Sequence, residues 1–280
     1  MNAASMRVAF VGGGNMASAL IGGLIARGTS ARQFRVVEPS SAQRASLAQR
    51  FPGVELFAEA SASAIADADV VVFAVKPQQM RAAASAFSAH IENVAVVVTV
   101  AAGIRIDDLS RWLGGYRRIV RVMPNTPALI GAGIAGLYAP REVDSRAREV
   151  AETVLRAAGD VVWCNREEAL DAITGISGSG PAYVFYFIEA LEQAARDLGF
   201  SPGDARRLAY ATFAGAVALA QKSDASVATL RAQVTSKGGT TERAIATLER
   251  DRVKAAIVEA VKAAAARANE LGDEFGRDAQ

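Results

Sequence analysis

The stretch Gly12-Gly13-Gly14-Asn15-Met16-Ala17 decides the fold of the first part of the chain. It follows an apolar run at 7–11 that is typical of a buried strand, and it opens a segment with helical character at 15–27. The spacing G-x-G-x-x-[G/A] between a strand and a helix is the fingerprint of dinucleotide-binding folds. The sequence therefore predicts a dinucleotide site here, and a glycine-rich turn without a ligand is the alternative.

Each small residue of this stretch has a physical role. Gly12 allows the tight turn, Gly14 lets the backbone approach a pyrophosphate, and Ala17 lets the helix pack closely on the strand. The free N–H groups at the start of the helix then face the anion.

The pattern of strands and helices predicts an α/β protein with two domains. Apolar strands at 7–11, 34–38, 69–75, 94–100, 119–123, 134–138 and 161–164 alternate with helices in the first half. Such runs favour a mainly parallel sheet that is covered on both faces. Beyond residue 166 the periodicity predicts helices alone, at 167–174, 181–198, 202–222, 226–233, 241–248 and 252–271. We therefore expect a Rossmann domain at 1–165 and an all-α domain at 166–280.

Composition excludes several kinds of chemistry. The 280 residues include 31 basic and 29 acidic side chains, so nothing favours nucleic acid or an anionic membrane as a partner. One cysteine, Cys164, forbids an intramolecular disulfide and a cysteine-based metal site, and a His-ligated zinc site is hard to build from one histidine, His90. No metal is expected. Residues 1–7 lack the apolar part of a secretory signal, so we expect a cytoplasmic protein.

The end of the second strand bears on which dinucleotide binds. An acid at this position, here Glu38, usually accepts the ribose hydroxyls of NAD and repels the 2′-phosphate of NADP. Ser40, Ser41 and Arg44 follow, however, and these side chains could hold a phosphate. The residues alone therefore do not decide between NAD and NADP.

Two more loops follow predicted strands at the edge where such sheets bind ligands. Ala74-Val75-Lys76-Pro77 ends the third strand, and Lys76 could lie near the dinucleotide or be a solvated turn residue. Met123-Pro124-Asn125-Thr126-Pro127 ends the fifth strand, where two prolines stiffen the backbone. Asn125 could place the nicotinamide, or the loop could be a structural turn.

The second half contains one glycine- and hydroxyl-rich loop, Val234-Thr235-Ser236-Lys237-Gly238-Gly239-Thr240-Thr241-Glu242. A helix follows it, and successive N–H groups in such a loop can form a nest for a carboxylate. The loop is therefore a candidate for a substrate anion. A further apolar helix, which contains the residues 183–188, would expose apolar area on a small bundle. We expect a homo-oligomer built through this domain, with a self-contained bundle as the alternative.

Taken together, these segments resemble pyrroline-5-carboxylate reductase. The similar stretches are Phe10 to Met16, Ala74 to Pro77, Ala101 to Ile104, Met123 to Ala128, Ser177 to Tyr183 and Thr235 to Thr241. The resemblance implies a Rossmann domain, an α-helical dimerisation domain, and homodimers that assemble further to decamers. It also implies hydride transfer from NADP in its reduced form, with NAD as the other candidate, to the imine of L-1-pyrroline-5-carboxylate, giving L-proline.

The resemblance also assigns residues. It implies a catalytic Thr241 beside the ring nitrogen and substrate binding by Ser236, Gly238, Gly239, Thr240 and Thr241. The cofactor site predicted from the residues and the resemblance comprises Gly12, Gly14, Asn15, Met16, Glu38, Ser40, Ala74, Val75, Lys76, Pro77 and Asn125. Lys237 and Glu38 depart from residues common in the family at their positions.

Two other functions remain open from the residues. Another imine or 3-hydroxyacid reductase would usually place a catalytic lysine or aspartate on a helix of the second domain, and 181–198 holds no lysine. A dinucleotide sensor without turnover would not need a second anion site. Asp224 is a candidate proton donor, with a solvated loop acid as the alternative.

Overall fold

The computed structural model describes residues 6–277, and a mixed sheet forms the centre of its first part. In the described residues the strand order is β3-β2-β1-β4-β5-β6-β7-β8. All neighbouring strands run parallel except β6 and β7. The strands are β1 (Val8–Val11), β2 (Phe34–Val37), β3 (Glu55–Phe57), β4 (Val70–Phe73), β5 (Val96–Thr99), β6 (Ile119–Met123), β7 (Gly133–Tyr138) and β8 (Gly159–Trp163). The predicted Rossmann domain with a mainly parallel sheet is confirmed.

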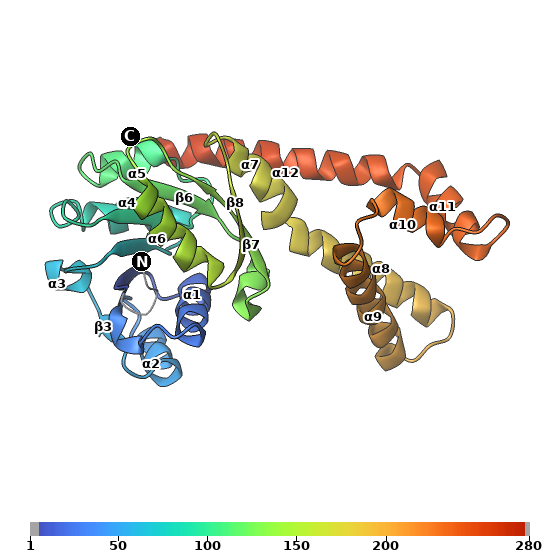
Figure 1. Cartoon of the computed structure of the whole chain (residues 1–280), viewed down its shortest axis with the longest axis horizontal. Helices are drawn as coiled ribbons and strands as arrows, with labels where there is room; N and C mark the ends of the chain where they lie inside the picture. The colour runs from blue at the N-terminus through green and yellow to red at the C-terminus, as the bar shows by residue number, and fades with distance from the viewer. Residues whose placement is uncertain (1–5, 278–280) are drawn as a thin grey trace. The chain divides into compact units, whose positions relative to one another are not determined.

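Helices cover both faces of the sheet, as its apolar strands require (Figure 1). One core lies between the sheet and α1 (Asn15–Ala26), α2 (Ser41–Arg50) and α6 (Ser145–Arg156). The other core lies between the sheet and α3 (Ala62–Ile65), α4 (Pro77–Ser85) and α5 (Ile106–Trp112). Strands β1, β4 and β5 are buried along their whole length, so they show no alternation of polar and apolar residues.

The sequence misses β3. This strand has three residues, stands at the sheet edge and pairs with β2 alone. Its side chains are half-buried or exposed, so it shows neither a long apolar run nor enough alternation to be recognised. The predicted strands at 69–75 and 94–100 are also longer than the observed ones, because the adjoining apolar residues belong to loops.

The described residues after β8 contain helices and no strand, as predicted. They are α7 (Ala169–Ile173), a π-helical turn (Thr174–Gly178), α8 (Gly180–Asp197), α9 (Pro202–Gln221), α10 (Val227–Gln233), α11 (Thr240–Arg250) and α12 (Val253–Gly276). Residues 1–5, where the sequence predicts no secretory signal, and residues 278–280 lie outside the described residues.

The compact units divide at a different place from the predicted boundary at 165 and 166. The first unit runs to Ser179 and takes in the chain again from Ala263, and the second unit is Gly180–Lys262. A buried ion-pair network explains why the first unit keeps these segments. Arg121 on β6 is 3% exposed and pairs with Glu167 and with Asp171, at 3.0 and 3.2 Å.

The same network reaches the end of α12. Asp171 also pairs with Arg105 at 2.9 Å, and its second oxygen accepts a hydrogen bond from Asn269 Nδ2 at 3.3 Å. Gly272 of α12 lies so close to Arg105 that a Cβ atom there would be 2.7 Å from the guanidinium Nε. The carboxyl-terminal part of α12 is therefore bonded to the first unit, although the whole second unit, Gly180–Lys262, precedes it in the chain.

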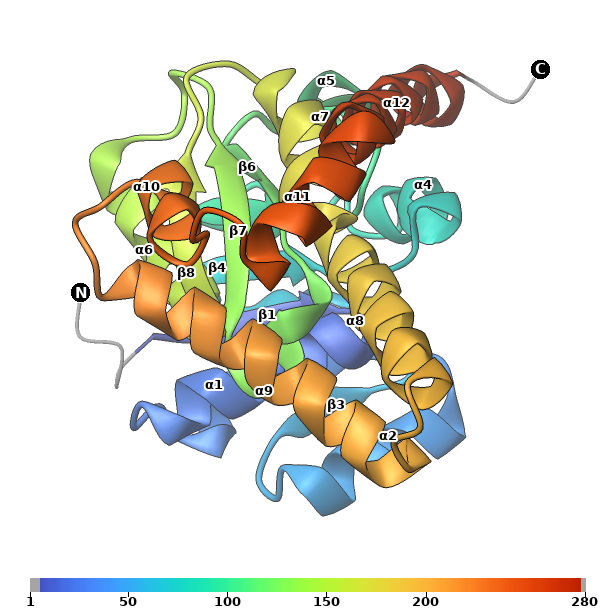
Figure 2. The same cartoon turned by 90° about the vertical axis from the view of Figure 1, so that its right-hand side faces the viewer.

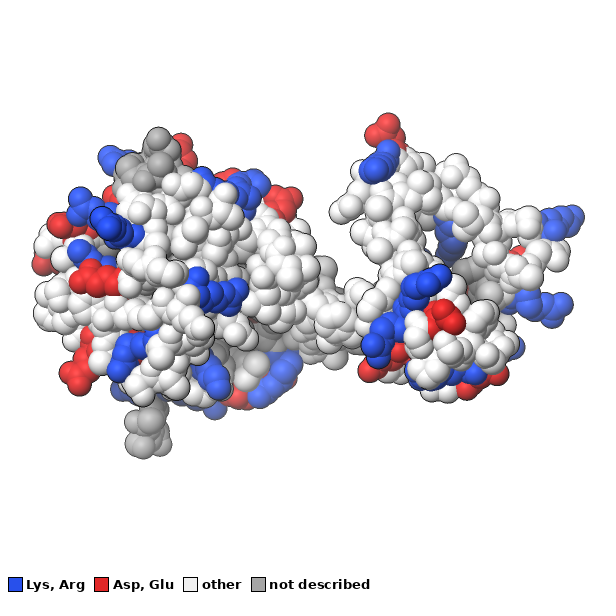
Figure 3. Space-filling view, turned by 90° about the horizontal axis from the view of Figure 1, so that it is seen from below, with Lys and Arg blue, Asp and Glu red and all other residues white. Residues whose placement is uncertain are grey.

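The second unit exposes much apolar surface. In it α8 and α9 pack against each other (Figure 2), and α8 has no buried residue. Phe185 and Tyr186 of α8 are 61% and 71% exposed, and Tyr210 of α9 is 52% exposed. On the face seen in Figure 3, acidic and basic side chains are interspersed on each unit rather than gathered by sign. These side chains form the exposed apolar area that the sequence predicts on this bundle.

Two adjacent glycines of α1 provide a test of the packing. A Cβ at Gly23 would overlap the carbonyl oxygen of Ala157, whereas a Cβ at Gly22 would make an ordinary 3.6 Å contact with Phe51. Gly23→Ala should lower the free energy of unfolding by about 1–3 kcal/mol through overpacking. Gly22→Ala should raise it by about 0.5–1 kcal/mol, because alanine favours a helix more than glycine does. Urea unfolding followed by circular dichroism checks both, and equal effects would contradict the close approach.

Candidate active site

The glycine turn after β1 is shaped by a close approach of backbones. Gly12 has a φ of +95°, and a Cβ there would lie 2.8 Å from Val75 Cγ1 and 2.9 Å from the Ala74 carbonyl oxygen. Gly14, which precedes α1, has no atom within 4 Å of its Cβ position, and no side chain caps the helix. No capping side chain thus occupies the first amides of α1, and free amides at a helix start are the groups that bind a pyrophosphate.

A crevice of about 750 Å³ extends from this turn along the carboxyl ends of the neighbouring strands. Its volume is within the range of pockets that bury ligands of moderate size. The structure brings many of the predicted cofactor residues together there, namely Gly12, Gly14, Glu38, Ser40, Ala74, Val75 and Lys76. This is the edge of a parallel sheet at which ligands bind in open α/β folds.

Some lining residues were missed by the sequence reasoning. Ala58, Glu59 and Ala60 line the crevice because they follow β3, the strand that the sequence does not reveal. Gln78 and Gln79 line it from the first turn of α4. Pro77 could have revealed these two glutamines, because proline is common at the first position of a helix. A helix that begins at Pro77 places both of them in its first turn.

The ribose end of the crevice is organised around Glu38. One oxygen of its carboxylate accepts a hydrogen bond from the Gly13 N–H at 3.0 Å, and the other accepts one from the Ser40 N–H at 2.9 Å. Arg44, a sequence candidate for a phosphate ligand, donates instead from Nη1 to the carbonyl oxygens of Glu38 and Pro39, each at 2.7 Å. Arg44 is not among the residues that line the crevice.

The other predicted cofactor residues lie outside the lining. Asn15 and Met16 open α1, and Met16 borders a small hollow with Pro124. Pro77 is the first residue of α4. Asn125 accepts a hydrogen bond from the Ile134 N–H at 3.0 Å and donates one to the Ser177 carbonyl at 3.2 Å. Its side chain therefore ties the proline-rich loop to β7 and to the π-helical turn, and a contact of Asn125 with the nicotinamide stays a prediction.

The hydroxyl-rich loop of the second half lies in the second unit. Gly238 has a φ of +74°, and its N–H donates to Glu242 Oε2 at 2.6 Å. Gly239 precedes α11 without a side-chain cap, and a Cβ there would lie 2.5 Å from Ser236 Oγ. Thr240 and Thr241 form the start of α11, Thr240 exposed and Thr241 half-buried. Uncapped amides and hydroxyls at a helix N-terminus suit a small anion.

The remaining reactive side chains show no catalytic arrangement. His90 is exposed in the turn region after α4. Cys164 is half-buried, and burial raises the pKa of its thiol, which disfavours the thiolate that a nucleophile needs. Between residues 6 and 277 no cluster of His, Cys, Asp and Glu has a metal-binding arrangement. Within the same residues no helix is long and apolar enough to cross a membrane.

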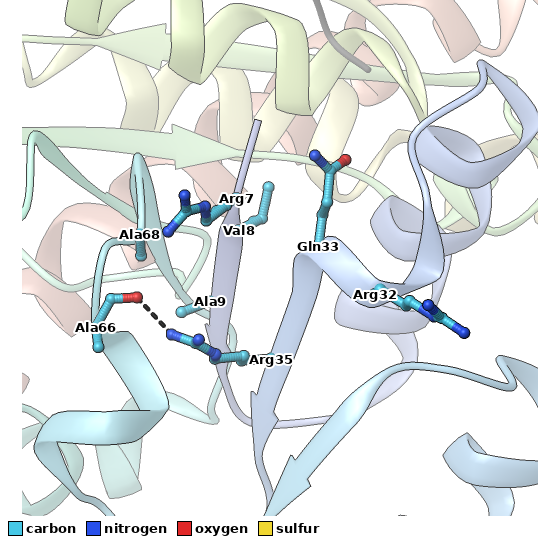
Figure 4. Close-up of a pocket in the computed structure, with 8 residues that line it drawn as sticks. All are labelled: Arg7, Val8, Ala9, Arg32, Gln33, Arg35, Ala66 and Ala68. Atoms are coloured by element: carbon cyan, nitrogen blue, oxygen red, sulfur yellow. Dashed lines mark hydrogen bonds between the residues drawn. The ribbon is translucent and has the colours of Figure 1, made fainter. Parts of the chain in front are cut away.

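A second cavity, of about 190 Å³, opens at the amino ends of β1 and β2 (Figure 4). Two of its arginines are already paired: Arg7 with Asp67 at 3.1 Å, and Arg35 with Glu55 at 3.0 Å. Arg35 also donates to the Ala66 carbonyl oxygen. This cavity is on the opposite edge of the sheet from the glycine turn, so it does not belong to the dinucleotide crevice.

Comparison with known proteins agrees with this geometry. A family model described as pyrroline-5-carboxylate reductase dimerisation matches residues 167–271, and one described as NADP oxidoreductase coenzyme F420-dependent matches residues 7–103. A pyrroline-5-carboxylate reductase of Pseudomonas aeruginosa is 43% identical over 97% of this chain and 98% of its own.

Two solved structures are similar over nearly the whole chain. A pyrroline-5-carboxylate reductase from Coxiella burnetii has a TM-score of 0.89 and 38% identity, covering 95% of this chain and 98% of that one. The Plasmodium falciparum pyrroline carboxylate reductase with NADP bound has a TM-score of 0.84 and 27% identity, covering 96% of this chain and 99% of that one. The chain therefore belongs to the pyrroline-5-carboxylate reductase family, and it is an NAD(P)H-dependent oxidoreductase that acts on a CH–NH bond.

Proposed function

We propose that the crevice of the first unit binds the dinucleotide and that the loop Ser236–Thr241 binds L-1-pyrroline-5-carboxylate, which is reduced to L-proline. The bound dinucleotide supplies the hydride for the imine carbon, and the nitrogen gains a proton. The protein then has to hold two reactants in register rather than provide a nucleophile. An exposed His90 and a half-buried Cys164 are compatible with such chemistry.

The observation that carries the substrate assignment is the uncapped start of α11. Helix N-termini attract anions, and here Gly239 precedes α11 with no side chain bonded to its first amides. The substrate carboxylate can take those amides and the hydroxyls of Ser236 and Thr240. Thr241, at the second position of the helix, is then the hydroxyl assigned to the ring nitrogen. Asp224 lies exposed in a bend, so we assign it no proton transfer.

The role of Thr241 can be tested by removing its hydroxyl. A hydrogen bond to a charged group contributes about 1.5–3 kcal/mol, so Thr241→Ala should lower kcat/KM for pyrroline-5-carboxylate by about 10- to 100-fold. The Kd of NAD(P)H should change little, because the predicted contact is with the substrate. Thr241→Ser should keep most of the activity.

Thr247→Ala is the matched control, since Thr247 is exposed on the same helix and its hydroxyl donates to the Arg243 carbonyl at 3.2 Å. Steady-state kinetics and cofactor titration measure the two effects separately. Full turnover in Thr241→Ala would remove this residue from the reaction.

We also propose that the second unit forms a homodimer and that dimers assemble to a decamer. The exposed apolar side chains of α8 and α9 support the dimer, because a monomer seldom leaves large apolar patches in water. The family model that covers residues 167–271 is described as a dimerisation domain. A cytoplasmic location, with neither nucleic acid nor membrane as a partner, stays a prediction of the sequence.

Light scattering coupled to size exclusion tests the assembly. The unaltered protein should have the mass of a decamer or of its dimers, and Tyr186→Asp should shift it toward the monomer by placing a charge in the apolar surface. Arg141→Asp is the control, because Arg141 belongs to the first unit and its side chain is 94% exposed. A monomeric unaltered protein would exclude the proposed assembly.

A further inference from the structure

We propose that Glu242 is a positioning residue for the substrate: its carboxylate holds the Lys237–Gly238 peptide so that the start of α11 stays open to the carboxylate of pyrroline-5-carboxylate. The inference rests on the proposed function of the loop Ser236–Thr241 as the substrate site. It concerns a residue that follows this loop and acts on the substrate through the backbone of Gly238.

The loop before α11 contains a tight turn of four residues. Gly239 N–H donates to the Ser236 carbonyl oxygen at 3.0 Å, and this hydrogen bond closes the turn. Gly238, the third residue of the turn, has a φ of +74°, a conformation that is sterically open to glycine. The closing bond leaves the N–H of this third residue without a partner inside the turn. Glu242 provides the partner, because its Oε2 accepts from the Gly238 N–H at 2.6 Å.

Glu242 supplies one half of a capping box. In the full motif, a side chain on the residue before the helix binds an amide of the first turn, and a glutamate three residues later binds back to the N–H of that residue. Here the residue before α11 is Gly239, which has no side chain, and Glu242 reaches one residue further back, to Gly238. The turn is thus held while no side chain caps the first amides of α11. These amides stay available to an anion.

The same bond fixes the direction in which the Lys237–Gly238 peptide faces. The N–H and C=O groups of a planar trans peptide point in opposite directions. Because the Gly238 N–H points to Glu242, which lies in the first turn of α11, the Lys237 carbonyl oxygen points away from that carboxylate. Without Glu242 this peptide could turn over, and the carbonyl oxygen would then oppose an anion at the start of the helix.

The charge of Glu242 and its hydrogen bond have opposite effects on a bound carboxylate. The side chain is exposed, so water and salt screen the repulsion between the two negative groups. The hydrogen bond does not require the charge, since the amide oxygen of a glutamine also accepts from a backbone N–H at this position of a capping box. Removal of the charge alone therefore distinguishes positioning by the bond from repulsion by the carboxylate.

Three substitutions at Glu242 make this distinction. Glu242→Ala removes the bond and should raise the KM for pyrroline-5-carboxylate by about 3- to 10-fold, the size of one net hydrogen bond, with kcat little changed. Glu242→Gln keeps the acceptor and should leave this KM within about twofold of that of the unaltered protein. Glu242→Asp keeps the charge but is one methylene shorter, so it should resemble Glu242→Ala. The Kd of NAD(P)H should not change, because the loop does not line the crevice.

Glu249→Ala is the matched control. Glu249 is 66% exposed on the same helix, and its carboxylate lies 4.0 Å from Arg231 Nη1, so its removal should leave the KM unaltered. Hydrogen exchange of the segment 234–242, followed by mass spectrometry, measures the loop without turnover. Glu242→Ala should speed exchange there, and Glu249→Ala should not. Circular dichroism checks folding, and Glu242→Asp provides the same test if Glu242→Ala does not fold.

The outcomes separate this proposal from the one on which it rests. An unaltered KM in Glu242→Ala, a loss in kcat alone, or a Glu242→Gln as impaired as Glu242→Ala would overturn the positioning role. A KM that Glu242→Ala and Glu242→Gln both lower would show repulsion by the carboxylate and overturn it as well. If Thr241→Ala still impairs turnover, the substrate site stands and the role of Glu242 alone is lost. If Thr241→Ala and Glu242→Ala both leave turnover unaltered, the loop is not the substrate site and both proposals fail.

Discussion

Arg121 places a positive charge inside the sheet, and the rest of the first unit is arranged to neutralise it. A buried charge without a partner costs several kcal/mol, so Glu167 and Asp171 must stay beside it. Asp171 in turn holds Arg105 and Asn269, and Asn269 belongs to α12. One buried cation thus joins β6, the segment that begins at α7 and the carboxyl-terminal part of α12. Because the chain leaves and re-enters the first unit on either side of 180–262, this network anchors both connections.

The candidate cofactor site depends on a second constraint, which is the contact between two strand ends. Gly12 fits against Ala74 and Val75 only without a side chain, so the ends of β1 and β4 meet closely. The sheet order then places the end of β2, with Glu38, next to the glycine turn. The residues that we propose for pyrophosphate and ribose contacts are consequently far apart in the sequence.

The sequence predicted those parts of the site that depend on the conformation of a few neighbouring residues. The turn at Gly12 and Gly14, the proline start of α4 and the glycines before α11 depend on backbone preferences that act within a few residues. The sequence predicted less well the side chains whose hydrogen-bond partners are far away in the chain. For Asn125 and Arg44, the structure adds protein partners that the sequence does not reveal, and their contact with a ligand stays a prediction. Glu59 went unnoticed because its strand, β3, is too short to leave a periodic pattern.

By itself the sequence determined the Rossmann fold, the all-helical second half, and the family, because these follow from glycine spacing, apolar periodicity and contiguous motifs. The tertiary structure alone decided that the compact units divide after Ser179 and that the carboxyl-terminal part of α12 returns to the sheet. It also decided that Glu38, and not Arg44, faces the crevice. The physical reason is that burial and pairing of charges depend on three-dimensional neighbours, whereas turns, caps and amphipathic faces depend on residues nearby in the chain.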